Sequence, residues 1–411
     1  MKNLKKILAV VLAMVLMAAM SVTMFAANGD MTGEGGKIGE FTDAANATAQ
    51  GNTVTLYKEL VAVNPAGSTV NAPAISYSYA IAPGTAGKVI TDSQGVVANT
   101  KAGLTGATIT ETVAWTNADA LSTSATGVAS RKAITVDFSG VNWTGAGVYR
   151  YAITETAPNY AASSVTEGDT THVRYLDVYV RDTETGYEIY GYVCFSVDGD
   201  ITSNSEAAAK KTEGFVEVSG DTSTAVSADK YYTYDLEVTK TVVNDRANND
   251  HDFPFSVTFT PATGVNAANI KLDTKVNTDA ALGNGYAGAL TSDTPKLQNG
   301  GSVKYIGIPY GTAVAINETN DVAGTTYKVV STGADTNIDQ SITGTSAGVV
   351  SGNAVVNAQT TENLATKTVA VTNTFELISP TGVILRIAPF AIILLAGIVL
   401  FVVARRRRVE D

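Results

Sequence analysis

The chain has 411 residues, of which 45% are hydrophobic, and it carries a net charge of −11 with two histidines. An acidic chain without a basic stripe is not expected to bind nucleic acid, and its length allows two or three domains with cores of their own. The single cysteine, Cys194 in YGYVCFSVD, cannot form an internal disulfide. Its aromatic and β-branched neighbours predict a buried structural thiol, with a reactive surface thiol or a thioester partner as the alternative.

Residues 1–27 have the pattern of a secretory signal peptide. Lys2, Lys5 and Lys6 precede an apolar run, and the small residues Ala26 and Ala27 offer a cleavage site. A retained membrane helix is the alternative, but polar sequence follows at once. We therefore expect export, with residues 28–49 forming a lead segment before the first domain.

Between the two ends of the chain, apolar residues alternate with Thr, Ser, Tyr or charged residues, which is typical of half-buried strands. The sequence DTETGYE reads as a hairpin. Residues 119–130 and 264–285, rich in Thr and Ala, are expected to be long surface loops, some briefly helical. Many short strands with such turns predict an all-β fold of antiparallel sandwiches. The expected strands are NTVTLYKELVAV, AISYSYAIA, KAITVDFSGV, VYRYAITET, RYLDVYVRD, YEIYGYVCFSV, YDLEVTKTVV, PFSVTFTP, GTAVAINET and KTVAVTNTF.

The order of landmarks in the first half of this region recurs in the second. Each half has a strand lysine, an aromatic alternating strand, a strand ending in Glu-Thr, and a strand with Asp or Asn. The first half reads TLYKEL, ISYSYAIAP, GVYRYAITETAPN and SADKYYTY, and the second reads LEVTKTV, FPFSVTFTP, YGTAVAINETND and AVTNTFE. Such self-similarity predicts a duplicated sandwich, with one domain over residues 50–230 and the next over 231–377, joined end to end with little slack.

Each half contributes one lysine, one glutamate and one acceptor side chain: Lys58, Glu155 and Asp229, then Lys240, Glu318 and Asn373. The period of two places Lys58, Lys240, Glu318 and Asn373 on the core face of their strands; Lys240, for example, has the parity of Val238. Three buried polar groups are costly when isolated, so we expect each set to meet inside its sandwich.

A triad of this kind can form a covalent bond. Burial lowers the pKa of a lysine and raises that of a glutamic acid, because desolvation disfavours both charged forms. The neutral amine can then attack the side-chain carbonyl of Asn or Asp while the glutamic acid moves protons. Ammonia or water leaves and an isopeptide bond remains. The plainer alternative is a lysine that snorkels to solvent and a Glu-Thr pair that starts a turn.

The C-terminal region ends in three short segments. The pentapeptide ISPTG spans residues 378–382, the expected membrane span covers 383–404, and 405–411 form a basic tail. Within that span, the 18 residues from Ile387 to Ala404 carry no charge and are long enough to cross a membrane. Four consecutive arginines in that tail place it on the cytoplasmic side by the positive-inside rule. These segments predict a chain exported and held at the membrane by its C-terminus.

The motifs YAITE around Glu155, INET around Glu318 and VTNTF around Asn373 resemble those of Gram-positive major pilins of the streptococcal T-antigen type, the pilin isopeptide-linkage domain family. The resemblance covers residues 50–382. It implies two tandem Ig-like (CnaB-like) domains, each with a Lys–Asn or Lys–Asp bond between first and last strands, assisted by the glutamate without a cofactor. The first domain departs from the common pattern because Asp229 takes the place of Asn.

The resemblance also interprets the tail. ISPTG is similar to variant LPxTG sorting signals, which implies that a sortase cleaves between Thr381 and Gly382, with Pro380 holding the peptide extended. The membrane anchor would then be transient and the protein would reside in a cell-surface, wall-anchored pilus. The implied partners are the sortase, other pilin subunits, peptidoglycan and a possible host receptor. Candidate lysines for the bond between subunits are Lys210, Lys211 and Lys230.

The leading hypothesis is therefore the shaft subunit of a sortase-assembled pilus. A wall-anchored adhesin that does not polymerise, or a minor or basal pilin, is the alternative. An extracellular enzyme is poorly supported, because His172 and His251 lie far apart and show no Ser/His/Asp grouping. The Asp-rich turns lack a full calcium-loop pattern, so no metal site is expected.

Overall fold

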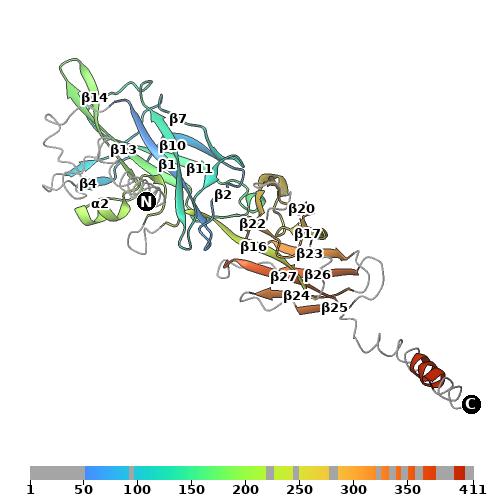
Figure 1. The fold of residues 1–411 in the computed structure, drawn as a ribbon. Coiled ribbons are helices and arrows are strands. Elements are labelled where there is room, and N and C mark those ends of the chain that lie inside the picture. The colour runs from blue at the N-terminus through green and yellow to red at the C-terminus, as the bar shows by residue number, and fades with distance from the viewer. Residues whose placement is uncertain are drawn as a thin grey trace, which may run out of the picture.

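In the computed structural model, the described residues are 51–91, 97–218, 226–243, 250–276, 286–320, 325–332, 339–343, 350–356, 364–375 and 393–402. Strands dominate these ranges, which confirms the all-β prediction. Helical structure within them is short: α2 (Asn204–Lys210), the 3₁₀ turns η2 (Ala161–Ser163) and η3 (Ala267–Asn269), and a helix over 393–402. Figure 1 shows two β-domains end to end, with that helix beyond the second.

The first domain is a sandwich of two sheets. In one sheet β1 lies between β10 and the start of β16, and β7, β12 and β15 extend its edges. The facing sheet has the order β14-β13-β11-β3-β8. The bounds are β1 (Thr53–Val63), β3 (Ile75–Pro83), β7 (Thr108–Ile109), β8 (Thr112–Trp115), β10 (Val128–Asp137), β11 (Gly147–Thr156), β12 (Val165–Thr166), β13 (Val173–Thr183), β14 (Gly186–Phe195), β15 (Gly214–Phe215) and β16 (Asp229–Val243).

Among the described residues, five smaller strands between β1 and β10 in the chain complete the first domain. β2 pairs with β9, β4 pairs with β5, and β6 joins β11. Their bounds are β2 (Val70–Asn71), β4 (Val89–Thr91), β5 (Val97–Asn99), β6 (Lys101–Ala102) and β9 (Ala120–Leu121).

The second domain repeats the plan. One sheet has the order β19-β18-β22-β16 and continues through β27, β24 and β25; the facing sheet has the order β20-β17-β23-β26, with β21 also paired to β17. The bounds are β17 (Phe253–Thr260), β18 (Lys271–Val276), β19 (Tyr286–Ala289), β20 (Ser292–Asp293), β21 (Lys296–Leu297), β22 (Ser302–Pro309), β23 (Ala313–Asn320), β24 (Thr325–Thr332), β25 (Asp339–Thr343), β26 (Val350–Val356) and β27 (Lys367–Phe375).

Alternation in the sequence translates directly into burial. Along β17, Phe253, Phe255, Val257 and Phe259 are buried while the residues between them are more exposed, as a strand with one face on the core requires. The same pattern in β3 directs Ile75, Tyr77 and Tyr79 inward. These apolar faces form one core in each domain.

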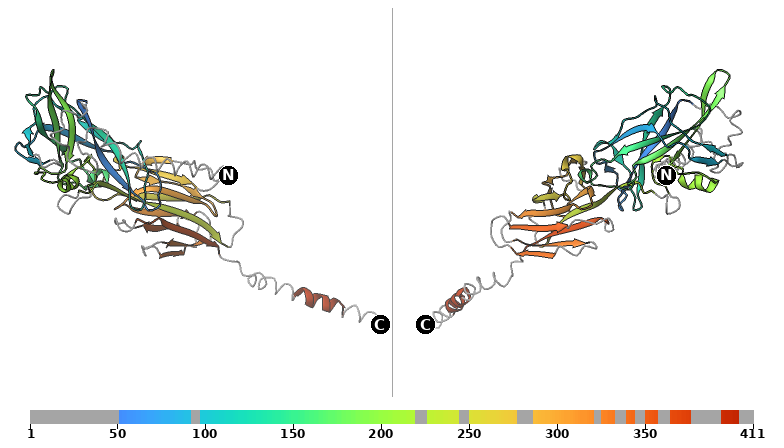
Figure 2. Two further views of the ribbon diagram at one scale, coloured as in Figure 1. Left: turned by 90° about the vertical axis from the view of Figure 1, so that its left-hand side faces the viewer. Right: turned by 180° about the vertical axis from the view of Figure 1, so that it is seen from behind.

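Strand β16 joins the domains without a linker. Its first residues pair with β1, while Leu236–Val243 pair with β27, so the expected boundary between residues 230 and 231 falls inside a continuous strand. Both turned views in Figure 2 show this strand running from one domain into the other. Because a β-strand is already extended, this junction has little slack.

A buried carboxylate strengthens that junction. Asp235, on β16, accepts hydrogen bonds from Asn64 Nδ2 at 2.8 Å and Ser68 Oγ at 2.5 Å, both from the first domain. Lys304 Nζ, from β22 of the second domain, lies 3.1 Å from Oδ2 of the same carboxylate. The Asp235 side chain is fully buried, whereas the Lys304 side chain keeps 28% of its surface exposed. The cluster thus connects the domains at the base of both sandwiches.

The structure corrects three expectations. The sheets are not purely antiparallel, because first and last strands pair in parallel (β1 with β16, β16 with β27); each last strand must leave its domain in the direction in which the first strand runs. Residues 264–285 are not all loop, since β18 pairs with β22 there, and residues 119–130 include β9 and the start of β10. In β18 the buried Leu272 and Thr274 alternate with the exposed Lys271 and Lys275, a strand pattern that the Thr- and Ala-rich composition of the region concealed.

The terminal predictions concern residues that are largely outside the described ranges. Residues 1–50 and 376–392, which include Pro380, Thr381 and Gly382, lie outside them, as does the tail after residue 402. Within the described part of the chain, no helix is both long and apolar enough to cross a membrane.

Candidate functional site

The second domain brings its three predicted residues together in the core. Lys240 comes from β16, Asn373 from the neighbouring β27, and Glu318 from β23 of the facing sheet. Lys240 Nζ lies 2.7 Å from Glu318 Oε2, and Asn373 Nδ2 donates to Glu318 Oε1 at 2.6 Å. All three side chains are at most 2% exposed. One carboxylate therefore bridges an amine and a carboxamide inside an apolar sandwich.

Aromatic rings surround this amine. Lys240 Nζ lies 4.0 Å from the centre of the Phe253 ring and 5.9 Å from that of Phe255. Desolvation by burial lowers the pKa of Lys240 to about 8, although the Glu318 carboxylate opposes the shift. Asn373 Oδ1 is buried and has no hydrogen-bond partner among the described residues. The site thus holds a lysine that gives up its proton easily beside a carboxamide carbonyl that no described donor engages.

The first domain builds the corresponding arrangement. Lys58 is on β1, Glu155 on the facing β11, and Asp229 at the start of β16. Lys58 Nζ lies 3.0 Å from Glu155 Oε1 and 2.8 Å from Asp229 Oδ2, with all three side chains buried. The Tyr77 ring lies 4.1 Å from Lys58 Nζ. The amine is therefore in contact with both carboxylates.

The register of the strands is the same in the two domains. Asp229 pairs with Leu60 and Asn373 pairs with Val242, and each partner lies two residues after the lysine of its triad. Parallel pairing at this offset puts lysine and acceptor on one face of adjacent strands. The equivalence extends to the facing sheet, where the glutamates Glu155 and Glu318 pair with Tyr79 and Phe255.

Two donors hold the Asp229 carboxylate. The backbone N–H of Gly168 donates to Oδ1 at 2.8 Å, and the Tyr160 hydroxyl donates to Oδ2 at 3.2 Å. Residue 168 has to be glycine, because a Cβ there would lie 2.1 Å from the carbonyl oxygen of Ala228. Burial and the nearby carboxylates raise the pKa of Tyr160 well above its ordinary value, so it remains a donor.

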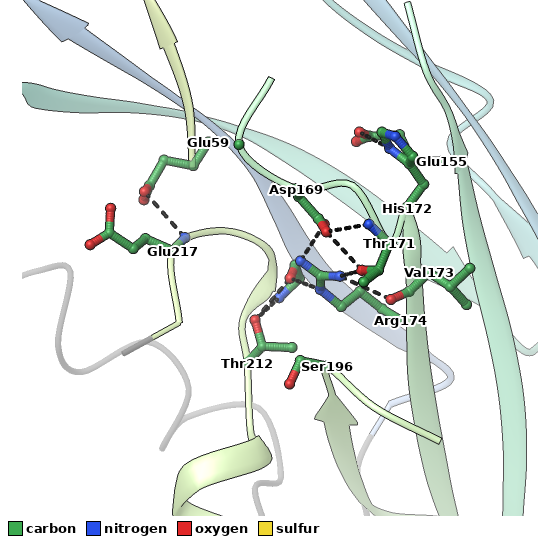
Figure 3. Close-up of polar contacts among 12 residues, drawn as sticks. Glu59, Glu155, Asp169, Thr171, His172, Val173, Arg174, Ser196, Thr212 and Glu217 are labelled. Carbon is green, nitrogen blue, oxygen red and sulfur yellow. Dashed lines mark hydrogen bonds and ion pairs between the residues drawn. The ribbon is translucent and has the colours of Figure 1, made fainter. Parts of the chain in front are cut away.

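Two further groups contact the Glu155 carboxylate. The Tyr79 hydroxyl donates to Oε2 at 2.8 Å, and burial together with Glu155 raises the pKa of Tyr79. His172 Nδ1 lies 3.5 Å from Oε1, while its Nε2 lies 2.7 Å from Glu167 Oε1. Figure 3 shows the imidazole and the Glu155 carboxylate side by side. The histidine therefore lies between a buried and a partly exposed carboxylate.

The segment that carries His172 is held by an ion pair. Asp169 accepts from the backbone N–H and hydroxyl of Thr171 and lies 2.6 Å from Arg174 Nη2. Figure 3 shows Asp169, Thr171 and Arg174 in contact. Arg174 Nε donates to Gly214 O at 2.6 Å, and its guanidinium lies over the ring of Phe215. Because Phe215 pairs with Lys58 across β15 and β1, this network connects the His172 segment to the triad.

All six residues predicted for the two triads thus meet as two groups of three. The lysines proposed for bonds between subunits do not share a site. Lys210 is the last residue of α2, and its Nζ lies 3.1 Å from both Glu206 Oε1 and Asp200 O. The backbone of Lys211 forms an isolated antiparallel β-bridge with Phe195, and Lys230 lies within β16. Cys194 is buried, and burial raises the pKa of its thiol to about 12, in keeping with a structural role.

Sequence reasoning missed four residues of the first site: Tyr79, Tyr160, Gly168 and His172. Tyr79 could have been found, because it shares the inward parity of Tyr77 in ISYSYAIAP. Tyr160, Gly168 and His172 lie on the irregular segment between β11 and β13, where no periodicity indicates which side chains turn inward. No cluster of metal-ligating residues occurs within the described ranges.

Part of the chain matches a known protein family. Residues 234–374 match a family described as a domain of unknown function, DUF7601. This match covers the second domain and less than half of the chain. No curated protein matches the chain.

Solved structures that are similar to the chain include pilus proteins. The major pilin of Streptococcus pyogenes is 19% identical with a TM-score of 0.38, covering 79% of this chain and 99% of that one. The T3.2 major pilin of Streptococcus pyogenes is 17% identical with a TM-score of 0.41, covering 79% and 100%. A pilus-presented adhesin is 16% identical with a TM-score of 0.25, covering 50% and 37%.

Proposed function

We propose that this chain is a structural subunit of a sortase-assembled surface pilus, whose two domains each form an internal Lys–Asn or Lys–Asp isopeptide bond. The observation that carries the proposal is the repetition of one buried arrangement: a lysine on the first strand, an acceptor on the parallel last strand at the same register, and a glutamate facing them. Two isolated buried lysines have no comparable structural reason to share this geometry.

In the second domain the reaction begins with a proton transfer from Lys240 to Glu318. The neutral amine attacks Cγ of Asn373, and a new C–N bond forms while the Glu318 proton is passed to the departing amide nitrogen. The Glu318 carboxylate then takes the surplus proton from the attacking nitrogen. The original Cγ–Nδ2 bond breaks, and the released ammonia takes up this proton and leaves as ammonium, which restores the glutamate. The phenylalanines favour the first step because they exclude the water that would stabilise the ammonium.

In the first domain the acceptor itself can take the proton of Lys58, since Asp229 Oδ2 lies 2.8 Å from Nζ. The amine then attacks Cγ, and Oδ2 leaves as water with a proton of the amine. Oδ1 becomes the amide oxygen, and the Gly168 N–H that already binds it stabilises the negative charge that develops there. The fold thus holds the reactants at contact distance, which supplies much of the rate.

These bonds would serve a mechanical purpose. In the chain-entropy model, a crosslink that closes a loop of well over 100 residues stabilises a domain by about 5 kcal/mol. Because each bond joins the first strand to the last, tension applied at the two ends passes through covalent bonds rather than shearing the strands apart. The continuous strand β16 contributes to both domains, so tension would pass from one crosslinked domain directly to the other.

Assembly follows from the sequence after β27. Pro380 comes shortly after Phe375, the last residue of that strand, and there a sortase would recognise ISPTG and join the Thr381 carbonyl to a lysine of another subunit. Lys210, Lys211 and Lys230 are the candidates for that lysine. A wall-anchored adhesin with the same stiff domains is the second candidate function. Surface extracts that contain a ladder of SDS-resistant multimers would support the pilus subunit, and a single wall-linked species would support the adhesin.

The test of the crosslinks is the intact mass of the chain, measured under denaturing conditions. The mass should fall by about 17 Da for the Asn373 bond and about 18 Da for the Asp229 bond, as the leaving groups require. Peptide mapping should recover Lys240 joined to Asn373, and Lys58 joined to Asp229. An intact mass equal to that of the unmodified sequence would contradict the proposal.

A further inference from the structure

We infer that His172 is a positioning residue for the first-domain crosslink, replacing Lys58 as the counter-ion of Glu155 when the lysine loses its charge. The inference rests on the proposed function and deepens it, because it assigns a separate task to a residue outside the triad.

The geometry around His172 supports this role. Its buried Nδ1 faces Glu155 Oε1 at 3.5 Å and has no hydrogen-bond partner among the described residues, while Nε2 faces Glu167 Oε1 at 2.7 Å. A doubly protonated imidazole carries a proton on both nitrogens and would face a carboxylate with each. A backbone hydrogen bond also joins the two residues, since the N–H of Glu155 donates to the carbonyl of His172 at 2.8 Å.

His172 holds an uncommon backbone conformation. Its backbone φ is 51°, in the left-handed region that residues other than glycine seldom adopt. Residues kept in such regions cost energy and cluster at functional sites. The ion pair of Asp169 with Arg174, and the anchoring of Arg174 on Gly214 O, hold the segment in place. The surrounding structure thus enforces the orientation of the imidazole towards Glu155.

Charge accounting gives the reason for a second cation. Before reaction, the Lys58 ammonium lies between two buried carboxylates. Amide formation makes the lysine nitrogen neutral and turns the Asp229 carboxylate into an amide carbonyl, with one of its oxygens leaving as water, so Glu155 would remain a buried carboxylate without its cation. Of its two other contacts, the Tyr79 hydroxyl is neutral and His172 can carry charge. An unpaired buried charge is costly, so the crosslinked domain favours the imidazolium.

The charged groups near His172 come from each neighbouring element. Glu155 lies on β11, Glu167 precedes the histidine on its own segment, and Lys58 on β1 reaches the same Oε1 of Glu155. The Asp169–Arg174 pair flanks the histidine on the same segment. Only Lys58 and Asp229 change charge in the reaction, so a change in the titration of His172 reports on the crosslink.

The experiment is a histidine titration by NMR of the full chain, labelled in its histidine rings and kept in solution with a nonionic detergent. The chain has only His172 and His251, and His172→Asn assigns the two signals. The midpoint of His172 should be higher in the crosslinked wild type than in Asp229→Ala, where Lys58 keeps its charge, by about one pH unit or more. His251, packed on Phe253 in the other domain, should titrate identically in both.

Two further variants separate the causes. Lys58→Met cannot form the bond and lacks the competing cation while Asp229 keeps its negative charge, so its His172 midpoint should be at least as high as that of the wild type. Glu155→Gln keeps the shape of the side chain without its charge, and should lower the midpoint below the wild-type value. Equal midpoints in wild type and Asp229→Ala, or an unchanged midpoint in Glu155→Gln, would overturn the inference.

The mass of each sample distinguishes this inference from the proposal beneath it. A wild-type chain that lacks the loss of about 18 Da contradicts the first-domain crosslink itself. A chain that shows that loss while His172 titrates as it does in Asp229→Ala leaves the crosslink standing and refutes only the role of the histidine.

Discussion

The two domains present the same amine and carboxylate to acceptors of different charge, and their surroundings differ accordingly. Lys58 lies under Tyr77, and Glu155 pairs with Tyr79; the corresponding residues in the second domain are Phe253 and Phe255. Asp229 is held by two donors, whereas the carbonyl oxygen of Asn373 has none among the described residues.

The difference follows from the acceptors. A carboxylate adds a negative charge to the buried site and reacts poorly with an amine until it is protonated and polarised. The first domain therefore supplies donors to both of its carboxylates. The Tyr160 hydroxyl and the Gly168 N–H bind Asp229, and the Tyr79 hydroxyl and His172 lie against Glu155. A carboxamide is neutral, so the second domain needs a dry amine and one glutamic acid. Replacing Asn by Asp thus depends on changes in several other residues of the site.

The largest expected effect is the loss of one crosslink while the other persists. Glu318→Ala removes the group that accepts the Lys240 proton, so the loss of about 17 Da should vanish while the loss of about 18 Da remains. The uncrosslinked second domain should be less stable by about 5 kcal/mol, measured by denaturant unfolding. Glu237→Ala, on the same strand as Lys240 but outside the site, is the control. A retained 17 Da loss in Glu318→Ala would contradict the assignment.

A smaller effect should follow from displacing the donor to Asp229. In Gly168→Ala the new Cβ meets the Ala228 carbonyl, so the backbone N–H has to move away from Oδ1. We expect first-domain crosslinking to slow by about 100-fold, the size of effect found when an oxyanion donor is lost. Mass spectrometry during refolding of the chain from urea measures the rate, and the second domain of the same molecules is the control. Equal slowing of both bonds would indicate a general folding defect.

Changing pH should affect the second domain in a defined direction. The reactive pair has one proton, shared between Lys240 and Glu318, and the pKa of about 8 marks its loss. From pH 6 to pH 8 the pair keeps its proton, so the rate should be level. Above pH 8 the rate should fall about tenfold per pH unit, because the pair no longer has a proton to give to the leaving nitrogen. Refolding between pH 6 and 10 with mass detection tests this. A rate that continues to rise above pH 8 would show that Glu318 acts without its proton.

The smallest expected effect sharpens the comparison of tyrosine with phenylalanine. Tyr79→Phe makes this position of the first site resemble the second and removes a hydrogen bond to the Glu155 carboxylate. We expect first-domain crosslinking to slow by about tenfold, since a hydrogen bond to a charged group contributes about 1.5–3 kcal/mol of which the transition state loses a part. Tyr192→Phe, which removes a hydroxyl bound to Gly51 O elsewhere in the domain, is the matched control and should leave the rate unchanged.

Strand periodicity determined much of what the structure shows. The alternation along β1, β16 and β27 correctly predicted inward-facing Lys58, Lys240 and Asn373, because side chains on a strand can point to only two faces. The repeated order of landmarks predicted two domains with one triad each. The terminal segments, including Thr381, remain predictions from sequence.

Tertiary structure alone decided the rest. No local pattern indicates that first and last strands pair in parallel at a shared offset, because that register depends on contacts between residues far apart in the chain. The same holds for Gly168 and His172, which reach the first triad from an irregular segment held by Arg174. The sequence by itself determined which residues could react; the packing of distant segments decided which protons, donors and counter-ions they meet, because desolvation and hydrogen bonding depend on what surrounds a group in space.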